Sequence, residues 1–123
     1  MKRITVFYVT FPDEAAARSL AGILLEQKLI ACANIIPATG LFFWQGAMQD
    51  EKEWIGLFKT KPDLISKVRE KISASHPYEV PCIISSNVNA NDAYVDWVFE
   101  QTMVFRSSRR RCRCCRQSRD WKW

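Results

Sequence analysis

Apolar residues recur first with strand-like and then with helical spacing along the chain, which predicts a domain of mixed α and β structure. Ile4–Phe11 is rich in β-branched and aromatic residues, as is typical of a buried strand. The apolar residues that follow recur three and four positions apart, so an amphipathic helix is expected to about Lys28. Leu29–Ile36 predicts a second strand, which we expect to end at Pro37.

The middle of the chain predicts a hairpin. Leu41–Trp44 and Trp54–Thr60 are strand-like, and the polar segment Gln49–Glu53 lies between them. A kink or bulge is expected near Gly46. The remaining elements are expected to be a second helix that ends before His76, a strand at Cys82–Val88 and a short closing helix at Ala90–Met103.

A helix-start signal occurs twice, 50 residues apart. Thr10-Phe11-Pro12-Asp13 and Thr60-Lys61-Pro62-Asp63 each place a threonine where an N-cap is expected and a proline in the first turn. The order strand–helix–strand therefore repeats. The sequence predicts the α+β class and a ferredoxin-like βαββαβ sandwich, in which two helices cover one face of an antiparallel sheet, with a long central hairpin and a short C-terminal helix.

Composition and charge divide the chain into two parts. Its 123 residues, 48% hydrophobic and 25% charged, suit one globular domain, and no apolar run is long enough to cross a membrane. Residues 1–105 hold 10 Lys+Arg and 12 Asp+Glu, a net charge of −2, whereas residues 106–123 hold 8 and 1, a net charge of +7. We interpret 1–105 as the domain and 106–123 as a basic tail, either appended or frame-shifted.

The cysteines favour a reducing, cytoplasmic setting. Cys32 and Cys82 lie in apolar stretches of the domain, and three more lie among the arginines of the tail. Five is an odd number, and the spacing is not that of a secreted disulfide framework.

Residues with catalytic potential are few, and the sequence predicts a binding protein, not an enzyme. The chain has one histidine and four glycines, with no nucleophile elbow and no phosphate-binding loop. The acidic residues, including the Asp50–Glu53 segment, are interpreted as solvated surface. His76 lies at a helix end, close to Pro77 and Pro81, and is expected to be exposed. It is either a favourable cation at the helix end or a weak ligand for a divalent metal, copper above all, that needs further ligands from another subunit.

Several segments resemble the CutA divalent-cation-tolerance family. They are Leu29–Pro37, Trp44-Gln45-Gly46, Ser75–Pro81 and Tyr94–Trp97, and the family has them in this same order along the chain. The resemblance implies a cytosolic homotrimer, in which each long hairpin extends a neighbour's sheet, and a role in tolerance to copper and other divalent cations. It also implies a cleft between subunits, whose residues here are Cys32, Trp44, Lys59, His76, Tyr78 and Glu79, with His76 as the metal ligand.

The chain departs from this family pattern in places. Val9 and Ser75 stand where a copper-associated bacterial relative has Cys and His, and Gln45 and Ala47 replace a glutamate and a lysine of the hairpin. Two alternative functions stay open. One is a small-ligand-sensing trimer similar to the PII signalling proteins, with Lys59, His76 and Glu79 on the ligand. The other is nonspecific nucleic-acid binding through the basic tail.

Overall fold

The computed structural model describes residues 2–103, so the predictions for the tail lie outside the described residues. Four strands form one antiparallel sheet in the order β2-β3-β1-β4. The strands are β1 (Lys2–Phe11), β2 (Cys32–Trp44), β3 (Ala47–Thr60) and β4 (Ile83–Ala90). The helices are α1 (Glu14–Glu26), α2 (Ile65–Ser75) and α3 (Asp92–Gln101), with a 3-10 turn, η1 (Pro62–Leu64), before α2. This arrangement confirms the predicted ferredoxin-like sandwich.

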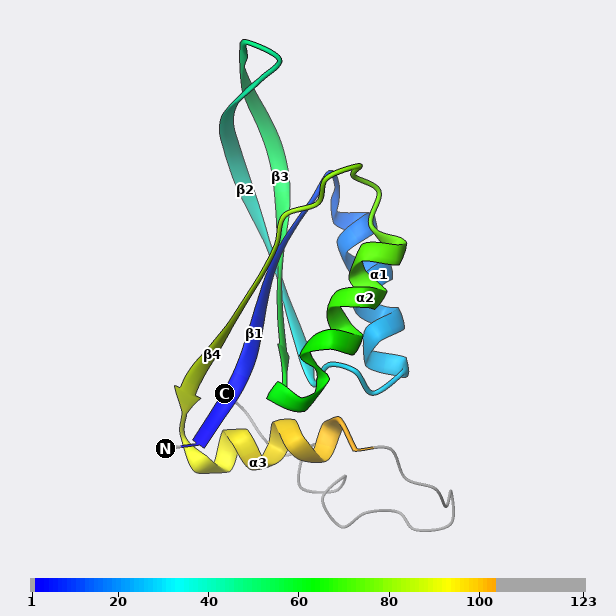
Figure 1. The fold of residues 1–123 in the computed structure, drawn as a ribbon, viewed down its shortest axis with the longest axis vertical. Coiled ribbons are helices and arrows are strands. Elements are labelled where there is room, and N and C mark those ends of the chain that lie inside the picture. Colours follow the sequence, from blue (N-terminus) through cyan, green and yellow to red (C-terminus); the bar gives the residue numbers. More distant parts are fainter. Residues whose placement is uncertain (1, 104–123) are drawn as a thin grey trace.

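Helices α1 and α2 lie side by side on one face of the sheet, and the β2–β3 hairpin projects beyond them as a long arm (Figure 1). The core fills the space between these layers. Alternate residues of β1 point into it, and Phe7, Val9 and Phe11 are fully buried with Phe58 of β3. The helices contribute the small and aliphatic side chains predicted from the helical spacing, which are Ala17, Leu20, Ala21, Leu24, Val68 and Ile72.

Helix α3 covers the other face of the sheet at the end far from the arm (Figure 1). Val95 and Val98 pack there against Ile4 and Ala31, and Trp97 lies against the same cluster, as its predicted apolar position required. Within residues 2–103, no helix covers the rest of this face. We call it the open face.

The helices begin close to the predicted positions, but the predicted threonines do not cap them. Asp13, not Thr10, is the N-cap of α1, and its side chain accepts a hydrogen bond from the Ala16 amide at 2.7 Å. Thr60 is a fully buried strand residue whose hydroxyl donates to the Leu29 carbonyl at 2.6 Å. Pro62 lies in the first turn of η1, as predicted, whereas Pro12 precedes the N-cap of α1 and lies outside the helix.

The hairpin is longer and more regular than predicted. Strand β2 runs unbroken through Pro37, which is tolerated because β2 is an edge strand of the sheet. The expected kink near Gly46 is a tight two-residue turn, with positive φ angles of 50° at Gln45 and 80° at Gly46. Such a turn matches the strand twist, so the polar segment Gln49–Glu53 continues as strand β3.

We expect Gly56→Ala to destabilise the fold. A Cβ at this position would lie 2.8 Å from the ring of Phe58 and 3.1 Å from that of Phe11, both fully buried. Relieving such overpacking typically costs about 1–3 kcal/mol. Chemical denaturation at a fixed protein concentration measures the loss. Gly22→Ala serves as the control, because a Cβ there meets no atom within 4 Å, and an equal loss in both variants would contradict the packing argument.

Candidate functional site

The arm carries its side chains on two faces in strict alternation. Phe42 and Trp44 of β2 point to the open face, and so do Gln49, Glu51 and Glu53 of β3, because Phe42 pairs with Gln49 and every second residue along each strand lies on the same face. Tyr8 and Thr10 of β1 lie on the same face, since their neighbours Phe7, Val9 and Phe11 point into the core. Sequence alternation and register thus collect aromatic and acidic side chains on one surface.

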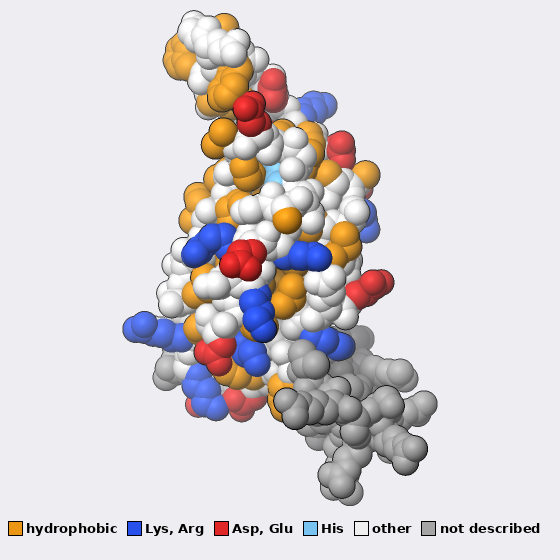
Figure 2. Space-filling model, turned by 45° about the vertical axis from the view of Figure 1, so that its right-hand side comes forward, with side chains coloured by type: hydrophobic (Ala, Val, Ile, Leu, Met, Phe, Trp, Pro, Cys, Tyr) orange, Lys and Arg blue, Asp and Glu red, His pale blue; other side chains and the backbone are white. Residues whose placement is uncertain are grey.

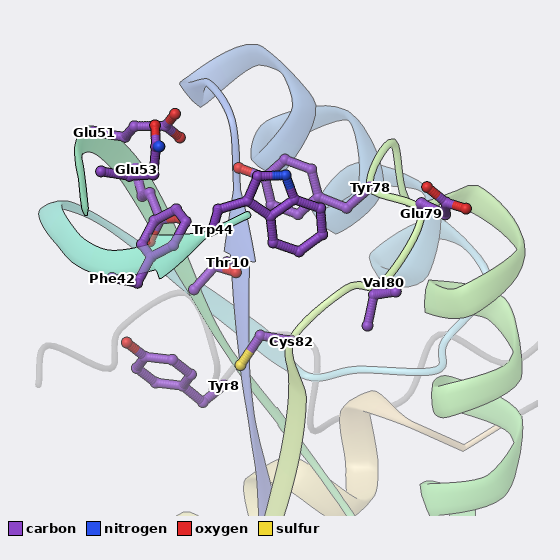
Figure 3. Close-up of a pocket in the computed structure, with 11 residues that line it drawn as sticks. Tyr8, Thr10, Phe42, Trp44, Glu51, Glu53, Tyr78, Glu79, Val80 and Cys82 are labelled. Carbon is purple, nitrogen blue, oxygen red and sulfur yellow. The ribbon is translucent and has the colours of Figure 1, made fainter. Parts of the chain in front are cut away.

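These side chains border a pocket on the open face of the arm (Figure 3). The segment between α2 and β4 forms its other wall. The pocket has a volume of about 590 Å³ and is lined by Tyr8, Thr10, Phe42, Trp44, Gln49, Glu51, Glu53, Tyr78, Glu79, Val80 and Cys82. Figure 3 places Glu51 and Glu53 on the arm side and Glu79 on the opposite wall, with the rings of Trp44 and Tyr78 between them.

His76 holds the opposite wall in place. Its Nε2 lies 2.6 Å from the Thr10 carbonyl oxygen, and its Nδ1 accepts a hydrogen bond from the Tyr78 amide at 3.1 Å. A carbonyl oxygen can only accept and an amide N–H can only donate, so Nε2 is the donor and Nδ1 the acceptor in these two contacts. The imidazole stacks on the Phe11 ring and lies tilted against the Tyr78 ring, with a distance of 5.0 Å between ring centroids in each case. His76 is therefore half-buried, not exposed as expected, and both of its ring nitrogens are engaged.

The pocket is electrically negative. Burial raises the pKa of the Tyr78 hydroxyl, and the negative charges of Glu53, Glu51 and Asp13 raise it further. No lysine or arginine is among the lining residues. Gly40 makes room for one of the carboxylates, since a Cβ there would lie 2.8 Å from Oε2 of Glu53.

Cys32 and Lys59 lie together elsewhere on the open face. Lys59 Nζ is 3.8 Å from Cys32 Sγ and also donates to the Asn34 side chain. Burial raises the pKa of the neighbouring Tyr94 hydroxyl, and its interaction with Cys32 adds to the effect. This cluster is not part of the pocket wall.

Three of the six predicted cleft residues thus line the pocket: Trp44, Tyr78 and Glu79. His76 supports its wall, whereas Cys32 and Lys59 lie apart from it. Glu51 and Glu53 were interpreted as solvated surface, and their place in the pocket was missed. The face on which they lie follows from counting along β3 in steps of two from the turn. This count requires knowing that the hairpin has a two-residue turn and no bulge.

Among residues 2–103, no three His, Cys, Asp or Glu side chains lie close enough together to hold a metal ion. The three carboxylates of the pocket are spread around its rim instead. In the same part of the chain, no helix is both long and apolar enough to cross a bilayer.

Fold and pocket together define a ferredoxin-like α+β protein with an aromatic and acidic pocket beside its long hairpin. Comparison with known proteins narrows this class. The profile of the CutA1 divalent ion tolerance protein family matches residues 5–101. The chain is also 38% identical over 98 residues to the divalent-cation tolerance protein CutA of Pyrococcus horikoshii, covering 79% of this chain and 96% of that one. The chain belongs to the CutA1 divalent ion tolerance family, as its motifs predicted.

Solved structures agree with this assignment. The crystal structure of the divalent ion tolerance protein CutA1 from Ehrlichia chaffeensis superposes with a TM-score of 0.81 at 40% identity, covering 85% of this chain and 99% of that one. The periplasmic divalent cation tolerance protein CutA of Archaeoglobus fulgidus gives a TM-score of 0.78 at 32% identity, covering 81% and 99%.

Proposed function

We propose that this protein acts in divalent-cation tolerance as a binding protein and catalyses no reaction of its own. It works as a homotrimer and binds copper or a similar metal weakly beside His76. The observation that carries the proposal is the acid-lined pocket between the arm and the segment that follows His76. Carboxylates and imidazole are ligands for divalent metals, and the family name supports a role for such cations.

The arm supports the homotrimer. On its face away from the pocket, Leu41, Phe43 and Met48 are 66%, 74% and 67% exposed, and Figure 2 shows apolar side chains gathered at its tip. Ile36 of β2 and Ile84 and Val88 of β4 are further exposed apolar residues, and they lie on the open face. A contact between two different apolar surfaces of neighbouring copies is head-to-tail, and it closes into a ring when the rotation from one copy to the next allows it. The proposed trimer has three times the chain mass of 14.3 kDa.

The metal would bind weakly because one chain offers an incomplete ligand set. No three suitable side chains converge within residues 2–103, and a metal at either ring nitrogen of His76 has to displace one of its hydrogen bonds. A neighbouring copy in the trimer would supply further ligands. The unpaired thiols of Cys32 and Cys82 support a reducing, cytoplasmic location.

We expect His76→Asn to weaken copper binding at least tenfold. Asparagine keeps one hydrogen-bond donor and one acceptor for the wall but lacks the imidazole nitrogen that copper favours. Calorimetric titration of Cu²⁺ into metal-free protein measures the change. Both proteins carry serine in place of the tail residues Cys112, Cys114 and Cys115, because their thiols would otherwise bind copper. Equal affinities would exclude His76 as a ligand, and His76→Ala repeats the comparison without any hydrogen-bonding group.

The small-ligand alternative is less well supported within a single chain. It requires Lys59, His76 and Glu79 on one ligand, but Lys59 lies beside Cys32 and the pocket wall is acidic, which disfavours an anion. It therefore depends on residues from different copies. The nucleic-acid alternative depends on the tail at 106–123, outside the described residues.

A further inference from the structure

We propose that Lys52 on the arm of a neighbouring copy seats in the acidic pocket of this chain and provides the positive charge that the pocket lacks. This inference rests on the proposed homotrimer and deepens it, because it names a residue that one copy contributes to the pocket of the next. It follows from opposite charges on the two surfaces and from matching spacings of side chains along them.

The pocket has an excess of negative charge. Glu51 and Glu53 line it from the arm and Glu79 from the opposite wall (Figure 3), and no lysine or arginine is among the lining residues. Within residues 2–103, none of these carboxylates forms an ion pair. A neighbouring copy that covers the open face removes water from them, which is costly unless it also brings a positive charge.

The outer face of the arm, which points away from the pocket of its own chain, carries a suitable charge. Lys52 lies on this face with Met48, because every second residue of β3 lies on the same side. Its side chain is exposed and, within the described residues 2–103, forms no ion pair. Lys59, by contrast, lies on the open face itself, where its ammonium group already contacts Cys32 and Asn34. Lys52 is therefore the better placed of the two to pair with a neighbouring copy.

The spacing along the arm matches the spacing on the open face. Met48 and Lys52 are four residues apart on β3, a distance of about 13 Å. Val88 and Ile84, both exposed on the open face, are likewise four residues apart on β4. An arm that runs antiparallel to β4 with Met48 against Val88 brings Lys52 to Ile84. Ile84 pairs in register with Tyr8, which lines the pocket, and the flexible stem of lysine lets the ammonium group enter it.

The acidic residue on the same face of the arm also finds a partner in this arrangement. Asp50 lies two residues before Lys52 on β3, and Ser86 lies two residues after Ile84 on the open face of β4. The antiparallel arrangement places Asp50 opposite Ser86, whose hydroxyl can donate to the carboxylate. The arm therefore brings its lysine to the pocket without adding a fourth carboxylate there.

The seated lysine is compatible with the proposed metal. Three carboxylates and one ammonium group leave a net charge of −2 in the pocket, which one divalent cation neutralises. The ammonium group also repels this cation, so the pairing between copies is a further reason for weak metal binding.

The test compares the assembly of full-length variants by light scattering after size-exclusion chromatography in urea, which is uncharged and does not screen ion pairs. We expect Lys52→Glu to raise the chain concentration at half-dissociation at least tenfold. The reversed pocket, Glu51→Lys with Glu79→Lys, should do the same, because it then repels the unchanged Lys52. Lys67→Glu, at an exposed position of α2, is the matched control and should assemble like the wild type.

Mixing the Lys52→Glu chains with the reversed-pocket chains separates pairing between copies from effects within one chain. In the mixture, each arm can seat on a pocket of opposite charge in another copy, so we expect trimers at lower concentration than for either variant alone. A wild-type trimer that Lys52→Glu leaves unchanged, or a mixture that dissociates like its separate components, overturns this inference alone. A wild-type protein that forms no trimer overturns the proposed homotrimer as well, so the two failures are distinguishable.

Discussion

Replacing Phe43 and Met48 of the arm with aspartate is expected to convert the proposed trimer into single chains. These residues face each other across the hairpin and are 74% and 67% exposed in one chain. In a trimer they would be buried against a neighbour, where an unpaired carboxylate costs several kcal/mol. Neither residue packs into the core of its own chain, so the isolated chain should keep its fold.

Light scattering after size-exclusion chromatography measures this effect. The wild-type protein should elute with three times the mass of 14.3 kDa, and the double variant with the mass of one chain. The matched control is Ser66→Asp with Ser73→Asp, which adds the same charge at exposed positions of α2. A double variant that keeps the wild-type mass would refute the arm as the contact between copies. Dissociation of the control variant would show that added negative charge alone separates the chains.

Phe58→Ala is expected to cost about 3–5 kcal/mol of folding stability. Phe58 is fully buried at the centre of the larger core cluster, and its ring lies 6.2 Å from that of Phe11. Removing the ring creates a cavity between the sheet and the helices. A loss of this size is a large part of the stability of a domain of this length.

Denaturant unfolding followed by circular dichroism, at one fixed chain concentration, tests this prediction, because the stability of an oligomer depends on concentration. The control is Phe99→Ala on α3. Phe99 is 36% exposed and makes a cation–π contact with Lys61 at 5.9 Å, so about 1 kcal/mol or less is expected. Similar losses for both phenylalanines would mean that burial does not determine the contribution of Phe58.

The elements of the fold could be predicted because local patterns encode them. The period-two pattern of β1 and the helical spacing of α1 lie within single segments, and the structure confirms both. Details that depend on neighbouring strands were missed. Pro37 marks a strand end by its local preference, yet it continues β2, because the position of β2 at the sheet edge leaves its missing N–H without consequence.

The pocket was predictable only in part, for a related reason. Trp44, Tyr78 and Glu79 stand in recognisable motifs, whereas Glu51 and Glu53 look like ordinary surface acids in the sequence. Their common orientation depends on the turn at Gln45-Gly46, since one extra residue there would turn both side chains to the other face. Motifs therefore identified one wall of the pocket, and hairpin register decided the other.

The sequence by itself determined the order of elements, the composition of the core and membership of the family, because each depends on residue types at short spacing. Only the tertiary structure decided what His76 does. Its neighbours in sequence, two prolines and a helix end, suggested an exposed ring. The packing of β1 against the segment after α2 instead gives Nε2 the Thr10 carbonyl and Nδ1 the Tyr78 amide. Thr10 lies 66 positions away along the chain, and no local pattern encodes a contact over that separation.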